Sequence, residues 1–95
     1  MVSSMPQMST RPDVMEVKRW LIERVALYLE KSPKEIDPAS PLAEMGMDSI
    51  YALSLCGDIE DNLNLAVEPT LAWDHPSIEA IAGYLVSQMA LKERR

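Results

Sequence analysis

The sequence predicts an all-α domain: a small four-helix bundle made of three main helices and one short helix. The 95 residues are enough for one hydrophobic core and too few for two. Leu, Ala, Met and Glu are abundant, whereas Phe is absent and strand-type runs of Val and Thr are missing. Apolar residues recur at helical spacing in three separate stretches, which sets the number of main helices.

The first helix is expected to begin just after Asp13. This residue can act as the N-cap, and Glu16, three residues later, can complete a capping box. Apolar side chains then follow at intervals of three or four residues, which places them on one buried face. These residues are Val14, Val17, Leu21, Val25 and Tyr28.

A proline-rich stretch, "KSPKEIDPASP", ends the first helix. Its three prolines each remove a backbone donor and disfavour helix at the preceding residue. Within it, Ser32 can cap a single helical turn that has Pro33 at its first position. We expect Ile36 and Leu42 to attach this long loop to the core, because long loops in small domains are usually functional or well anchored.

The second helix should begin at Asp48 or Ser49 and end near Leu63, and Asn64 suits the left-handed residue that often follows a helix. Its buried face is predicted to consist of Ala52, Leu55, Ile59 and Leu63. The opposite face is mixed, acidic with one apolar residue and one glycine. It carries Ile50, Ser54, Gly57, Asp58 and Asp61.

The last third of the domain begins with a connector, "VEPTLAWDHPS", which has room for one or two helical turns at residues 70–74. Ser77 is a suitable N-cap for the final helix. The predicted buried stripe of that helix is Ile78, Ile81, Ala82, Leu85 and Met89. These elements make residues 13–91 the folded domain, with a disordered leader at 1–12 and a C-terminal tail at 92–95.

Charge is distributed unevenly along the chain. The net charge is −6, and all nine Lys and Arg residues lie at or before Lys34 or at or after Lys92. Residues 35–91 contain ten acidic residues and no basic one. Such a surface would repel nucleic-acid phosphates, so we expect no nucleic-acid binding. It would attract partners with basic surfaces, although a merely solvated acidic face is the simpler alternative.

The sequence favours a cytoplasmic protein that does not enter a membrane. No apolar stretch approaches the roughly 20 residues that cross a bilayer. The first residues lack the hydrophobic segment of a signal peptide. Cys56 is the only cysteine, which excludes an internal disulfide and fits an intracellular setting.

Signals for catalysis are nearly absent. Ser49 is not in a G-x-S-x-G motif, because Gly46 lies three residues before it and Tyr51 occupies the second position after it. His75 is the only histidine and lies in a connector, and Cys56 falls near a buried helix face. No residues have metal-ligand spacing. We therefore expect neither a catalytic residue nor a metal site.

Ser49 has a structural and a functional interpretation. Asp48 or Ser49 can simply be an N-cap, since Asp and Ser are preferred there. Alternatively, the Ser49 hydroxyl is a covalent attachment point: Gly46 precedes it, a long loop delivers it, and a face beginning with the apolar Ile50 follows it. A helix N-terminus would also favour a phosphate carried on that hydroxyl.

The segment "GMDSI" resembles the G-x-D-S-hydrophobic signature of acyl and peptidyl carrier proteins. The longer segments "EIDPASPLAEMGMDSIYAL" and "PTLAWDHPSIEAIAGYL" are similar to the first loop, second helix and third-to-fourth helix region of these carriers, the latter as in modular polyketide synthases. The resemblance extends over residues 13–91. It implies that Ser49 is esterified by 4′-phosphopantetheine, whose thiol carries acyl groups as thioesters, with Asp48 beside the attachment site.

The resemblance also implies partners. A phosphopantetheinyl transferase would attach the arm from coenzyme A, an adenylating ligase or acyltransferase would load it, and ketosynthase-type enzymes would use it. These enzymes would present basic docking surfaces to the mixed face of the second helix, that is, to Ile50, Ser54, Gly57, Asp58 and Asp61. Binding should be weak and brief. The protein itself would be a non-catalytic monomer.

Two departures from the family pattern bear on the cargo. Ser54 stands where the fatty-acid type often has an acid, and Met47 stands where the peptidyl type usually has a second glycine. The first departure argues against close kinship with the fatty-acid type. The second favours an acyl carrier of polyketide or lipid biosynthesis, and the sequence also has some similarity to carriers loaded by fatty-acyl-adenylate ligases. The alternatives are a peptidyl carrier of a nonribosomal peptide synthetase and a helical adaptor without a prosthetic group.

Overall fold

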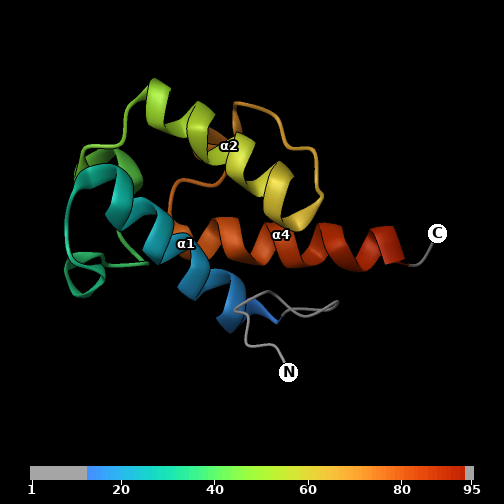
Figure 1. Cartoon of the computed structure of the whole chain (residues 1–95). Helices are drawn as coiled ribbons and strands as arrows, with labels where there is room; N and C mark the ends of the chain where they lie inside the picture. The colour runs from blue at the N-terminus through green and yellow to red at the C-terminus, as the bar shows by residue number, and fades with distance from the viewer. Residues whose placement is uncertain (1–12, 94–95) are drawn as a thin grey trace.

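The computed structural model describes residues 13–93, which form four α-helices and two short 3-10 helices (Figure 1). Their bounds are α1 Val14–Leu29, η1 Pro33–Glu35, η2 Leu42–Met45, α2 Ser49–Leu63, α3 Leu71–Asp74 and α4 Ile78–Glu93. Within this range no strand forms, and Pro41 and Ser77 make a single isolated bridge. The prediction of an all-α domain with three long helices and one short helix is confirmed. The predicted leader at 1–12, and residues 94–95 of the predicted tail, lie outside the described residues.

The helix ends follow from local sequence signals. At the start of α1, Asp13 and Glu16 form the predicted capping box, with the Glu16 amide 2.9 Å from the Asp13 carboxylate. Asn64 ends α2 in the left-handed conformation, with φ of 56°, as predicted. Ser77 caps α4 by accepting a hydrogen bond from the Ala80 amide at 3.1 Å. Each long helix therefore has at least one boundary defined by its own sequence.

The core lies where α1, α2 and α4 meet, with α1 packed mainly on α4 and α2 lying over both (Figure 1). Burial of a large apolar side chain is worth about 1.5–3 kcal/mol, so this core dominates stability. No polar or charged side chain among the described residues is buried in it. Its largest members are Leu21, Leu42, Leu55, Ile59, Ile78, Ile81, Leu85, Val17 and Val25. None of the described helices combines the length and hydrophobicity that crossing a bilayer requires.

Four residues of the predicted buried stripes are less buried than expected. Val14 is 40% exposed, since side chains lean toward the helix N-terminus and Val14 is the first residue of α1. Tyr28 is half-buried because its hydroxyl reaches a carboxylate of α2. Leu63 and Met89 lie toward the C-terminal ends of their helices and only pack against the edge of the core.

The loop between α1 and α2 is anchored at both the side-chain and the backbone level. Ile36 and Leu42 are buried in the core, as predicted. The Leu42 amide donates to the Pro76 carbonyl at 2.8 Å, and the Glu79 amide donates to the Pro38 carbonyl at 3.0 Å. These bonds attach the loop to the beginning of α4. The loop therefore delivers the first residue of α2 to a fixed place beside α3.

Candidate functional site

The turn before α2 depends on the backbone of Gly46. This glycine ends η2 with φ of 101°, a left-handed conformation that residues with a side chain rarely adopt. A Cβ atom there would contact only the Leu29 side chain, at an ordinary 3.8 Å. The glycine is therefore required for backbone conformation and not for space. The turn connects the end of η2 to the residues that begin α2.

Asp48, not Ser49, is the N-cap of α2. Its carboxylate accepts a hydrogen bond from the Tyr51 amide at 3.1 Å. Ser49 is the first residue of the helix and is exposed to solvent. Since Asp48 supplies the cap, the Ser49 hydroxyl is not needed for that structural role. The sequence left open whether Asp48 or Ser49 is the cap, and the structure shows that it is Asp48.

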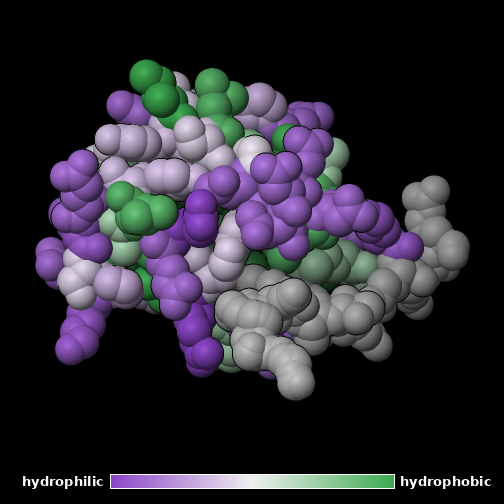
Figure 2. All heavy atoms as spheres, in the orientation of Figure 1, coloured by the Kyte–Doolittle hydropathy of each residue, from purple (hydrophilic) through white to green (hydrophobic). Residues whose placement is uncertain are grey.

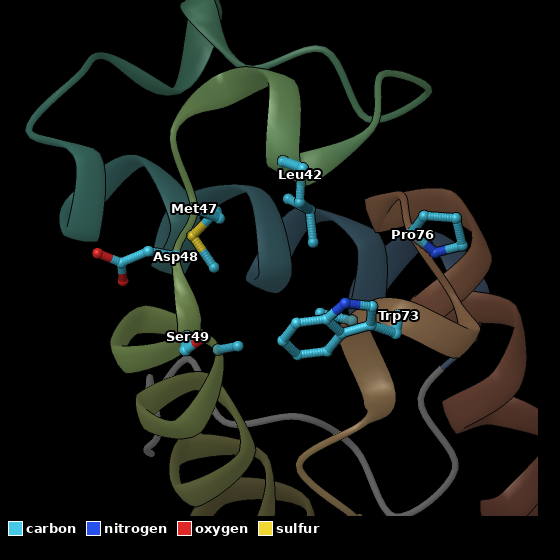
Figure 3. A pocket seen from close by; sticks show the side chains of 9 residues that line it. Leu42, Met47, Asp48, Ser49, Trp73 and Pro76 are labelled. Atoms are coloured by element: carbon cyan, nitrogen blue, oxygen red, sulfur yellow. The ribbon is translucent and has the colours of Figure 1, made fainter.

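A pocket of about 330 Å³ opens directly beside Ser49 (Figure 3). Its wall comes from the loop before α2, from α2 itself and from the α3 region. The lining residues are Leu42, Ala43, Met47, Asp48, Ser49, Ala52, Ala72, Trp73 and Pro76. In Figure 3 the Trp73 side chain faces Ser49 across the pocket, whereas the Asp48 carboxylate points away from it. The pocket is thus an apolar space with a hydroxyl at its edge.

The outer face of α2 has the mixed character that the sequence predicts. Ile50 is 70% exposed and Leu53 is 54% exposed, and Figure 2 shows apolar side chains gathered over the beginning of α2. Ser54, Gly57 and Asp61 are also exposed. The first turns of this face are therefore more apolar than expected, because Leu53 was not assigned to it.

Asp58 differs from the rest of the predicted face, because it is half-buried and engaged within the molecule. One carboxylate oxygen, Oδ2, lies 3.2 Å from the Arg24 guanidinium and also accepts a hydrogen bond from the Tyr28 hydroxyl. The structure gives Asp58 contacts that tie α2 to α1.

The contacts of Asp58 continue toward Ser49. The Tyr28 ring stacks on Tyr51, with ring centroids 5.8 Å apart, and Tyr51 follows Ser49 by two residues. Partial burial, followed by the Asp58 carboxylate, raises the pKa of Tyr28 to about 12. We call Arg24, Tyr28 and Asp58 the α1–α2 cluster. It ties α2 to α1 at Asp58, and the Tyr28–Tyr51 stack adds a second contact between the two helices closer to Ser49.

His75 and Cys56 lie apart from Ser49. His75 stacks on Tyr84 at 4.3 Å between ring centroids and lines a second cavity of about 230 Å³. The Cys56 thiol is buried next to the Glu68 carbonyl at 3.5 Å, and burial raises the pKa of this thiol. Neither side chain lines the pocket beside Ser49. The described residues contain no group of three or more His, Cys, Asp or Glu side chains that could hold a metal ion.

Sequence reasoning missed Trp73 and the α1–α2 cluster. Trp73 lies in a connector without periodicity, so its position opposite Ser49 could not be predicted from spacing. A cation and a carboxylate 34 residues apart, such as Arg24 and Asp58, give no local signal either. The 3-10 helix η2 did have a signal, namely a proline before it and a glycine after it.

Comparison with known proteins agrees with this geometry. Residues 19–85 match the family model described as the phosphopantetheine attachment site. Over 72 residues the chain is 35% identical to a phenolphthiocerol/phthiocerol polyketide synthase of Mycobacterium tuberculosis, covering 76% of this chain and 4% of that protein. It is 32% identical over 79 residues to the 6-methylsalicylic acid synthase of Penicillium patulum, covering 79% of this chain and 4% of that protein. The chain thus spans only a small part of the length of these relatives.

Solved structures of carrier proteins have the same fold. A free-standing peptidyl carrier protein from Acinetobacter baumannii superposes with a TM-score of 0.79 at 43% identity, covering 81% of this chain and 96% of that one. The acyl carrier protein LipD from Actinoplanes friuliensis superposes with a TM-score of 0.72 at 38% identity, covering 92% and 97% respectively. The chain therefore belongs to the phosphopantetheine attachment-site family, as a carrier protein with the family's helical-bundle fold.

Proposed function

We propose that Ser49 is the attachment point of 4′-phosphopantetheine and that the protein is an acyl carrier for polyketide or lipid biosynthesis. The observation that supports this most directly is the Ser49 hydroxyl itself. It is exposed at the first residue of α2 and lies within the matched family region. Because Asp48 is the N-cap of α2, the Ser49 hydroxyl has no capping role. When attached, the group supplies a thiol on which acyl chains are held as thioesters.

The site is chemically suited to the attachment. In this reaction the Ser49 oxygen would attack the pyrophosphate phosphorus on the pantetheine side of coenzyme A and give its proton to a base of the transferase. The P–O bond of the pyrophosphate would break, and adenosine 3′,5′-bisphosphate would leave. The phosphodiester is anionic, and the beginning of α2 presents backbone N–H groups and the positive end of the helix dipole to it. The apolar pocket beside Ser49 offers space for apolar parts of the arm or its cargo.

The preference for acyl over peptidyl cargo is supported by the curated relatives, which are polyketide synthases. Met47 directly before Asp48 also departs from the double glycine of the peptidyl type. The peptidyl alternative is kept because a peptidyl carrier protein is 43% identical to this chain. A transacylating enzyme with malonyl coenzyme A and an amino-acid-adenylating enzyme, each offered the modified protein, would separate the two. We expect the acyl mass to appear and the aminoacyl mass not to appear.

The partners follow from the proposed role. A phosphopantetheinyl transferase, a loading ligase or acyltransferase, and ketosynthase-type enzymes would dock on the exposed part of α2 with basic surfaces. We propose Ile50, Ser54, Gly57 and Asp61 as this face, with Asp58 acting mainly through its contacts to α1. The carrier would be monomeric and cytoplasmic and would leave catalysis to these enzymes.

Intact-mass measurement after incubation with coenzyme A and a broad-specificity phosphopantetheinyl transferase tests the proposal. We expect one phosphopantetheine mass on the wild type and none on Ser49→Ala. The control is Ser87→Ala, which removes an exposed serine of α4, outside the proposed docking face, and should be modified normally. No added mass on the wild type, together with partner binding that survives Ser49→Ala, would instead indicate a helical adaptor.

A further inference from the structure

Trp73 is exposed at a position where the fold gains little from it. It lies on the short helix α3, which is anchored by the buried Leu71, yet the Trp73 side chain is 67% exposed. Trp20, by contrast, is half-buried against the core from α1. In Figure 3 the Trp73 indole faces Ser49 across the pocket. The Trp73 indole therefore exposes a large apolar surface to solvent close to Ser49.

Exposed apolar side chains of α2 and α3 flank Ser49. Trp73 lines the same pocket as Ser49, whereas Ile50 and Leu53 follow Ser49 on α2 and lie outside the pocket lining. We call these three residues the apolar rim. Asp74 directly follows Trp73, Asp48 lies two residues before Ile50, and residues 35–91 contain no Lys or Arg. The surface therefore fits a protein with an apolar contact at its centre and basic side chains around it.

We propose that Trp73 is a docking contact for the phosphopantetheinyl transferase, on the side of Ser49 opposite α2. This rests on the proposed function, because it requires Ser49 to be the residue modified. Tryptophan is enriched among the residues that contribute most to protein–protein binding. The docking surface then includes both walls of the pocket, and not α2 alone.

The position of the bond that is made indicates that the transferase, among the proposed partners, is the enzyme that contacts Trp73. The bond it makes is at the Ser49 oxygen, so its active site must come within bonding distance of that atom. Enzymes that act later work on a thiol at the far end of a long arm and can remain further from Ser49. A standard interface buries about 800 Å² per partner, equivalent to a disc of roughly 16 Å radius. Centred on Ser49, this disc covers Trp73, which lines the same pocket.

Steady-state kinetics of pantetheinylation, followed by intact mass, test the proposal. We expect Trp73→Ala to raise KM by roughly ten- to thirtyfold with little change in kcat. Trp73→Phe should retain most of the affinity, because the phenyl ring keeps much of the apolar contact. The matched control is Leu27→Ala, which truncates a side chain that is 63% exposed on α1, and its KM should stay within about twofold.

Fluorine NMR of fluorotryptophan-labelled carrier provides a measurement that leaves Trp73 in place. Unlabelled transferase with coenzyme A is added to labelled Ser49→Ala carrier, which can dock but cannot react. We expect the Trp73 resonance to shift or broaden when transferase is added. The Trp20 resonance, which is assigned by means of Trp20→Phe, should keep its chemical shift and serves as the internal control.

Two results would overturn the proposal while leaving the proposed function intact. One is unchanged KM for Trp73→Ala, with an unperturbed Trp73 resonance, on a protein that is still modified at Ser49. The other is a Trp73 resonance that moves on attachment of the arm and not on addition of transferase, which would make the arm the occupant. Failure of the wild type to gain any mass would instead contradict the proposed function.

Discussion

At the scale of single residues, Asp58 shows how a structure changes the interpretation of an acidic side chain. On the sequence it belongs to an acidic helix face and would be expected to affect partner binding. In the fold its carboxylate is shared by the Arg24 guanidinium and the Tyr28 hydroxyl. Hydrogen bonds to charged groups are worth about 1.5–3 kcal/mol, more than an exposed ion pair. Asp58 is therefore expected to act first on stability.

Replacement of Asp58 tests this role. We expect Asp58→Asn to lower the free energy of unfolding by about 1–2 kcal/mol, and Asp58→Lys to lower it further by bringing a second cation to Arg24. The control is Asp61→Lys, at an exposed position three residues away, with an effect within about 0.5 kcal/mol. Urea unfolding measures all three. If the Asp58 and Asp61 variants were equally stable, the contacts of Asp58 with Arg24 and Tyr28 would not contribute to stability.

Tyr28 makes the same cluster sensitive to alkaline pH. Its pKa is about 12 in the fold against an ordinary value of 10.0, so the folded protein holds this proton where the unfolded chain has released it. Its contribution to stability is complete below pH 10 and is lost as the pH rises toward 12. We expect the free energy of unfolding of the wild type to fall relative to Tyr28→Phe across that window. A constant difference between the two proteins over the window would contradict the assignment.

At the scale of elements, the beginning of α2 combines a structural cap and a modification site in adjacent residues. Asp48 holds the helix start through the Tyr51 amide, and Ser49 carries the free hydroxyl. We expect Asp48→Asn to change the free energy of unfolding by less than about 0.5 kcal/mol, because Asn also caps helices well. Asp48→Ala should cost about 1 kcal/mol. Thermal and urea unfolding of the two variants would separate capping from charge, and equal losses would show that the cap is not the source of the effect.

The extent to which the sequence predicts these elements depends on the range of the interactions involved. Helix starts such as Asp13 and Ser77 were predictable because a cap bonds to an amide three residues away. The buried stripes were predictable in their middle turns and wrong at Val14, where helix geometry projects the side chain beyond the packed region. The pocket was not predictable, since it forms only when α3 folds back beside α2 and brings Trp73 opposite Ser49. Contacts across long stretches of chain leave no periodic trace.

At the scale of the whole molecule, the distribution of charge separates two regions. The acidic stretch 35–91 contains α2, α3 and most of α4, whereas α1 carries cations such as Lys18 and Arg19. Two of the α1 cations are used internally, since Arg24 pairs with Asp58 and Lys18 lies 3.7 Å from Glu79. These pairs offset the charges of Asp58 and Glu79, and the exposed Asp48, Asp61 and Asp74 give the α2–α3 side around Ser49 its acidic character. A partner with a basic surface would be guided to that side before any close contact forms.

This long-range attraction predicts a salt dependence of the transferase reaction. Raising ionic strength from about 0.05 M to about 0.5 M shortens the screening length from more than 10 Å to about 4 Å, so kcat/KM should fall several-fold. Asp61→Asn, on the exposed face of α2, should reduce both kcat/KM at low salt and its salt dependence. Glu23→Gln, an exposed acid of α1, removes the same charge away from that face and should leave the slope unchanged. Two results would contradict this prediction: a kcat/KM that does not change with salt, or equal effects of the two substitutions. Either would mean that the acidic surface serves solubility and that the apolar rim of Ile50, Leu53 and Trp73 is sufficient for recognition.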